Sequence, residues 1–84
     1  MAWYVYMLRC GDGSLYTGST TDVERRLREH QGGTGARYTR SRPPVTLAYA
    51  EEAPDRSAAQ RREAAIKKMP RAQKLKLIGK GERT

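Results

Sequence analysis

The sequence predicts an α+β fold: a small three-stranded antiparallel sheet flanked by helices, in the order β-β-α-β-α-α. Two short β-prone segments joined by a glycine-rich turn open the chain, and a third alternating segment follows at mid-chain. Segments with helix caps and with glycine or proline stops occupy the rest. The 84 residues suffice for one domain. We expect it to span 1–79, with a short polar tail at 80–84.

The first two strands form a hairpin. Residues 3–8 read Trp-Tyr-Val-Tyr-Met-Leu, a run rich in aromatic and β-branched residues and apolar on both faces, which is typical of a buried strand. Gly11-Asp12-Gly13 predicts a hairpin turn, and residues 14–19 predict the returning strand.

The turn decides which side chains face each other. If three residues stay unpaired in it, Tyr6 lies opposite Gly18 and diagonal to Tyr16, with both phenols on one side of the sheet. A two-residue turn at Asp12-Gly13 would shift the register by one and separate them.

A helix is predicted from residue 22 to about residue 31. Thr21 and Glu24 form a capping-box pattern at its start, and Gly32-Gly33 stops it. Residues 32–44 contain several glycines, prolines and arginines, and we expect a basic loop there.

The third strand is predicted from Val45, Leu47 and Tyr49, which alternate with smaller residues and would place one face on the core. The segment Pro54-Asp55-Arg56 ends it.

Two helices follow. Ser57 and Gln60 form a second capping-box pattern for a helix to about Met69. Pro70 breaks that helix, and the last helix is expected to run through Ile78 and to end at Gly79.

Polar residues interrupt the apolar stripe of the first helix. Val23, Arg26, Leu27 and His30 share one face because they are spaced three and four residues apart. Arg26 could extend its head to solvent or pair with a buried carboxylate. His30 could bond a carbonyl or interact with the last helical turn. Otherwise both are candidates for a functional site.

Glu63 is the matching anomaly on the second predicted helix, at the edge of a face that carries Ala59 and Ile66. We expect it to converge with Arg26, His30 and the two tyrosines on one side of the small sheet. It could be an ion-pair partner for Arg26. It could also bind a hard cation, since Mg²⁺ often uses one or two protein carboxylates and completes its shell with water and phosphate.

Charge points to a polyanionic partner. Seventeen Lys and Arg against nine Asp and Glu give a net charge of +8, which favours nucleic acid. The single Cys10 excludes an internal disulfide and lacks the companions of a zinc site. We therefore expect a cytoplasmic protein. The apolar run at 3–8 is too short to span a membrane, and no membrane association is expected.

Together these residues resemble the GIY-YIG nuclease domain. The resemblance rests on Tyr4-Val5-Tyr6, a nine-residue gap, Tyr16-Thr17-Gly18, then Arg26, His30 and Glu63. It covers nearly the whole chain, from Trp3 to about Ile78. Tyr4 stands where the name motif has its first glycine, and Thr17 stands where it has isoleucine.

The resemblance implies an endonuclease that hydrolyses phosphodiester bonds with Mg²⁺ or Mn²⁺, on DNA more readily than RNA. Glu63 would hold the metal, and Tyr16 would accept a proton from the attacking water or orient it. Tyr6 would support that hydroxyl network, and Arg26 would stabilise charge on the phosphate. His30, where other branches carry tyrosine, would assist proton transfer. Ser19 stands where some relatives carry lysine.

Two other functions fit the sequence. The protein could be a non-catalytic nucleic-acid binder with a vestigial nuclease site, or a protein-interaction module. Whether the protein is a nuclease or a non-catalytic nucleic-acid binder, basic and aromatic residues would contact phosphates and unpaired bases. These residues are Arg37, Tyr38, Arg40, Arg42, Lys67 and Lys68, with Arg71 and Lys74 added in the non-catalytic case. We expect selection by DNA structure and not by base sequence, because no segment is free to read base edges.

Overall fold

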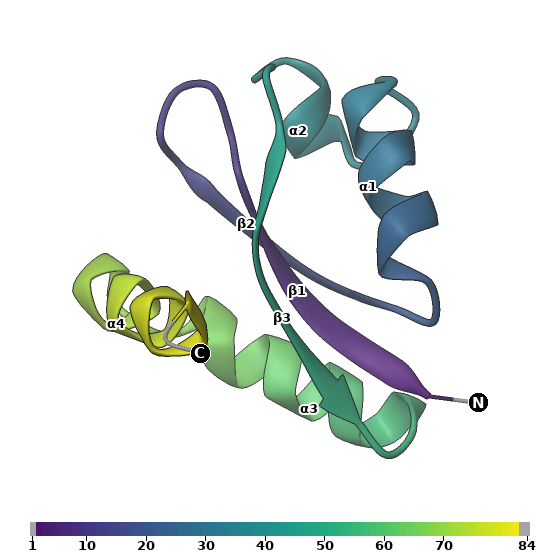
Figure 1. Ribbon diagram of the computed structural model, residues 1–84, viewed down its shortest axis with the longest axis vertical. Coiled ribbons are helices and arrows are strands. Elements are labelled where there is room, and N and C mark those ends of the chain that lie inside the picture. The colour runs from purple at the N-terminus through teal and green to yellow at the C-terminus, as the bar shows by residue number, and fades with distance from the viewer. Residues whose placement is uncertain (1, 83–84) are drawn as a thin grey trace.

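The computed structural model describes residues 2–82. A three-stranded antiparallel sheet in the order β2-β1-β3 lies at its centre. Helices α1 and α2 lie on one face of the sheet and α3 and α4 on the other (Figure 1). The α+β architecture is confirmed, with one more helix than predicted. The elements are β1 (Trp3–Arg9), β2 (Leu15–Thr20), α1 (Val23–Gln31), α2 (Arg37–Arg40), β3 (Thr46–Ala53), α3 (Arg56–Lys67) and α4 (Arg71–Glu82).

The middle strand β1 divides the core into two halves. Because side chains alternate along a strand, Val5 and Met7 pack with Ile66 on the side of α3 and α4. Tyr6 and Leu8 pack on the other side, against α1 and α2. Tyr6 of this second half also belongs to a cluster of polar side chains, because its hydroxyl contacts His30.

The three-residue turn is confirmed. Gly13 has a positive φ of 85°, which glycine adopts without strain. The register places Tyr6 opposite Gly18 and Leu8 opposite Tyr16, so both phenols lie on one side of the sheet.

Both predicted capping residues were wrong. Asp22 caps α1 in place of Thr21, and Asp55 caps α3 in place of Ser57, each through a carboxylate oxygen that accepts a backbone N–H of the first turn. A carboxylate also interacts favourably with the positive end of the helix dipole.

The predicted basic loop contains a helix. Residues 37–40 form α2, a single turn whose Thr39 is 1% exposed. The intrinsic pattern of so short a segment is weak, and the buried side of α2 is defined by its contact with α1, which only the tertiary structure reveals.

The predicted end at Gly79 was also wrong, since α4 runs to Glu82. Among the described residues, only Gly13 and Gly33 have positive φ, so Gly79 is an ordinary helical residue and not a cap. The expected tail therefore begins within the helix, and residues 83–84 lie outside the described residues.

The expected shared core face of β3 was wrong. The register between β1 and β3 shifts at Ala48, and such a bulge exchanges the two faces of a strand. Val45 packs with Tyr6 on one side of the sheet, while Tyr49 packs on the other. Leu47 is 44% exposed.

Within residues 2–82, no helix has both the length and the apolar character needed to cross a membrane.

Candidate active site

A buried hydrogen-bond chain links three elements. The Tyr6 hydroxyl of β1 lies 2.9 Å from Nε2 of His30 in α1. On the other side of the ring, Nδ1 of His30 lies 2.7 Å from the Thr39 hydroxyl of α2. The three residues are at most 2% exposed. His30 is thus a central buried residue and not a solvated helix end.

Gly18 makes room for Tyr6. A Cβ at this position would lie 2.6 Å from the Tyr6 hydroxyl oxygen and 2.8 Å from Cζ, closer than atoms can approach. The glycine of the second tripeptide therefore allows the tyrosine of the first to lie flat across β2.

Tyr16 lies over this chain. Its ring centroid is 5.1 Å from that of His30 and 6.4 Å from that of Tyr6. On its other side, the Tyr38 ring lies 5.9 Å away, and the Arg42 guanidinium stacks 4.0 Å from the centre of the Tyr38 ring. Tyr38 is thus packed against the site, although it remains 38% exposed.

Arg26 completes the group on this face. Its guanidinium pairs with Glu29 at 2.9 Å. Burial raises the pKa of Tyr6 to about 12, although the neighbouring Arg26 opposes this rise. Burial also lowers the pKa of His30, and the Arg26 charge lowers it further. Both buried groups are therefore neutral near pH 7.

Glu63 reaches the site from the opposite face, so the expectation that all five residues lie on one side of the sheet was wrong. One oxygen of its carboxylate accepts a hydrogen bond from Ser19 of β2 at 2.7 Å. The other lies 2.7 Å from the Lys67 ammonium. Because β2 is an edge strand, Glu63 lies at the rim, and its charge is among those that raise the pKa of Tyr6, after burial.

The alternative in which Arg26 pairs with Glu63 does not hold, because each has a partner on its own helix.

A metal at this rim would have one protein carboxylate. Within the described chain there is no cluster of three or more His, Cys, Asp or Glu side chains that could hold an ion. A hard cation such as Mg²⁺ fits this arrangement, since it commonly takes one carboxylate and fills its shell with water and phosphate oxygens. Its binding to Glu63 would compete with Lys67.

The predicted nucleic-acid-binding residues fall into two groups. Arg37, Tyr38 and Arg40 belong to α2, and Arg42 follows it. Arg42 also pairs with Asp12 at the hairpin tip, at 3.0 Å.

Lys67 and the exposed Lys68 lie at the end of α3. Lys67 is engaged with Glu63, which raises the pKa of Lys67.

Sequence reasoning missed several partners of the site residues. Thr39 gave no signal because its helix was not predicted. Ser19 was noticed only as the replacement of a lysine. Glu29 was not singled out, although its spacing of three from Arg26 could have indicated the pair. Arg62 was not assigned a partner either, and it pairs with Glu51 at 2.9 Å.

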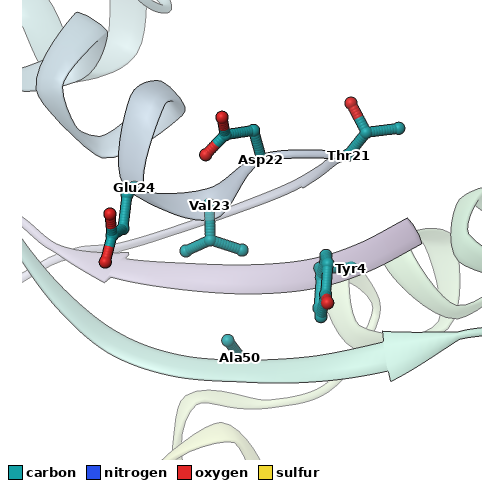
Figure 2. A pocket seen from close by; sticks show the side chains of 6 residues that line it. All are labelled: Tyr4, Thr21, Asp22, Val23, Glu24 and Ala50. Atoms are coloured by element: carbon teal, nitrogen blue, oxygen red, sulfur yellow. The ribbon is translucent and has the colours of Figure 1, made fainter. Parts of the chain in front are cut away.

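A shallow pocket lies apart from these residues. Figure 2 shows it at the start of α1, between Val23, Tyr4 and Ala50, with Asp22 and Glu24 at its rim. None of the residues of the tyrosine and histidine cluster lines it.

Comparison with protein families identifies a catalytic domain. The family described as GIY-YIG catalytic domain matches residues 2–76. This range contains all five side chains assigned to the candidate active site.

Similar proteins carry the name UPF0213. One from Streptococcus sanguinis is 60% identical over 75 residues, covering 89% of this chain and 86% of that protein. One from Halobacterium salinarum is 55% identical, covering 89% and 97%. A solution NMR structure of a UPF0213 protein from Bacillus halodurans has a TM-score of 0.63 and 45% identity, covering 99% of this chain and 89% of that one.

Proposed function

Because this chain belongs to the GIY-YIG family, a family of endonuclease domains, we propose that it is a cytoplasmic, divalent-metal-dependent endonuclease. It would hydrolyse phosphodiester bonds in DNA, and it would select substrates by structure and not by base sequence. The observation that carries this proposal is the grouping of Tyr6, Tyr16, Arg26 and His30 at the edge strand β2. Ser19 of the same strand binds the carboxylate of Glu63.

The tyrosines and His30 position the attacking water and transfer its proton. Tyr16 orients the attacking water or accepts its proton, and it is the less buried of the two phenols. Tyr6 supports that hydroxyl network from below, and its own hydroxyl contacts His30. Proton transfer by such positioned groups contributes about 10²–10⁴-fold to rates.

Arg26 and Glu63 stabilise the negative charge of the phosphate, Arg26 directly and Glu63 through the metal that it would hold. The guanidinium offers paired N–H donors that fit phosphate oxygens, and it is 32% exposed. Glu63 would hold Mg²⁺ or Mn²⁺, which supplies positive charge to the developing phosphorane when it is bound. Ser19 fixes the carboxylate from the strand side.

Structure selectivity is supported by the form of the basic surface. The helices are 4 to 12 residues long, and α2 presents Arg37 and Arg40 beside Tyr38, which is 38% exposed. Phosphate contacts made by arginines carry no sequence information, and an aromatic side chain can stack on an unpaired base.

The test is cleavage of labelled flap, fork, single-stranded and fully paired DNA of identical sequence, with Mg²⁺, Mn²⁺ or EDTA, and again with scrambled sequences. We expect metal-dependent cleavage at branches that persists after scrambling. Dependence on sequence and not on branching would contradict the proposed selectivity. Matched RNA substrates in the same assay show which nucleic acid is preferred.

One observation favours the alternative of a non-catalytic binder. The carboxylate that would hold the metal is already neutralised by Lys67. If no metal supports cleavage of any of these substrates while binding persists, the site is vestigial.

A further inference from the structure

Thr39 is buried next to the site, yet no step proposed above uses it. Its hydroxyl lies 2.7 Å from Nδ1 of His30, and it belongs to α2, which has no other buried side chain. A buried hydroxyl at this distance from an imidazole influences which ring nitrogen carries the proton, since the hydrogen bond made by one nitrogen determines whether the other is protonated.

The backbone of Ala36 approaches the same nitrogen. The backbone nitrogen of Ala36 lies 3.4 Å from Nδ1 of His30, and its hydrogen points at Nδ1. The peptide plane fixes the direction of this hydrogen. An unprotonated Nδ1 can accept the Ala36 N–H with its lone pair, whereas a protonated Nδ1 would place two hydrogens against each other.

The Thr39 hydroxyl can rotate, and two acceptors lie within its reach. Nδ1 of His30 is at 2.7 Å, and the Ala36 carbonyl is at 3.1 Å. A carbonyl oxygen can accept two hydrogen bonds, and this one also accepts the N–H of Arg40 at 3.1 Å. Because the contact with Nδ1 is the shorter of the two and the Ala36 N–H also requires a lone pair on Nδ1, the hydroxyl proton is assigned to Nδ1, where two donors then converge.

The ring is held tightly in this orientation. A Cβ at Gly35 would lie 2.5 Å from Nδ1 of His30 and 2.9 Å from its Cα. The connection between α1 and α2 therefore lies directly against the imidazole, and its glycine permits that approach. The hydrogen-bond partners of both ring nitrogens hold the ring in the same orientation.

From this geometry, we propose that Thr39 is a positioning residue that keeps the proton of His30 on Nε2 and so directs the Tyr6 hydroxyl proton toward the site. A neutral imidazole has one N–H. With Nδ1 as acceptor, Nε2 donates to the Tyr6 oxygen at 2.9 Å. The hydroxyl proton of Tyr6 then points away from His30 and is available to the hydroxyl network. The catalytic consequence, though not the tautomer, rests on the proposed function.

The experiment uses the single histidine of the chain. Nitrogen-15 NMR of the intact protein at neutral pH distinguishes a protonated from an unprotonated ring nitrogen without substrate or metal. We expect Nε2 to be protonated in the wild type and in Thr39→Ser. In Thr39→Val, which keeps the shape and removes the hydroxyl, we expect a mixture of tautomers. A wild-type ring protonated on Nδ1, or an unchanged tautomer in Thr39→Val, would overturn the proposal.

Should Thr39→Val fail to fold by circular dichroism, the wild-type spectrum still decides which nitrogen carries the proton, and Thr39→Ala replaces the variant. In the cleavage assay, Thr39→Val should lower kcat by about tenfold or more with little change in KM, and Thr39→Ser should restore it. If the wild type does not cleave DNA, the proposed function fails while the NMR result stands on its own.

Discussion

Glu63 combines two hydrogen-bonding roles with the charge that a metal would need. Replacing it in Glu63→Gln keeps the shape and an oxygen that can accept the Ser19 hydroxyl, but it removes the charge. We expect metal-dependent cleavage to be lost while the circular dichroism spectrum is unchanged, because a hard cation requires an anionic oxygen. Glu52→Gln, an exposed change of the same kind on β3, is the control and should cleave normally. Equal rates for Glu63→Gln and the wild type would remove Glu63 from the metal assignment.

Thr17 offers a stability test at the same scale. Its hydroxyl oxygen is the buried side-chain polar atom without a hydrogen-bond partner among residues 2–82. Thr17→Val removes that hydroxyl at nearly constant volume, so we expect the free energy of unfolding to rise by about 1 kcal/mol, because an unsatisfied buried group costs about 1–3 kcal/mol. Urea denaturation measures it.

Thr20→Val is the matched control for this test. The Thr20 hydroxyl accepts the N–H of Asp22 at 3.1 Å, so its removal should destabilise the protein. If Thr17→Val destabilises it as much, Thr17 has a partner that the fold does not reveal.

The sequence predicted the placement of the candidate site residues better than it predicted their surroundings. Spacing on a helix placed Arg26 and His30 on one face, and the hairpin register placed Tyr6 and Tyr16 on one side of the sheet, because both periodicities are local. Thr39 and Glu29 were missed, since their importance arises from contacts with His30 and Arg26. The side of the sheet from which Glu63 approaches was also wrong, because the chain order does not state which face a later helix covers.

At the scale of elements, β1, β2 and α1 were predicted within one or two residues, because period, turn and glycine stop agree there. The bulge at Ala48 and the helix α2 were not, since both depend on pairing with distant segments. The end of α4 was misplaced because Gly79 was interpreted as a cap. That error suggests a direct experiment on α4.

Gly79→Ala should stabilise α4. The residue is helical, it has no positive φ, and a Cβ there would meet nothing within 4 Å. Since glycine is about 1 kcal/mol less favourable than alanine within a helix, we expect the melting temperature to rise. Gly33→Ala is the contrasting variant, because φ is +84° at Gly33, and it should lower the melting temperature. A fall in both variants would indicate that α4 ends before Gly79.

For the whole molecule, the charge of +8 predicts that DNA binding weakens as salt rises. A plot of log affinity against log salt concentration should have a slope of roughly −0.9 for each phosphate neutralised. Arg37→Ala removes one phosphate-binding candidate from α2 and should reduce the slope by about one such increment. Fluorescence anisotropy of a labelled fork measures both. A flat plot would favour the protein-interaction hypothesis.

The two faces of the sheet also separate the optical signals of the protein. Trp3, the single tryptophan, packs against the core on the side of α3 and α4, with the Arg56 guanidinium 6.0 Å from its ring centre. The tyrosine cluster lies on the other side, beneath α1 and α2. Tryptophan emission therefore follows the unfolding of one half of the core and is insensitive to occupancy of the tyrosine face. Titrations of that face need a fluorophore on the nucleic acid.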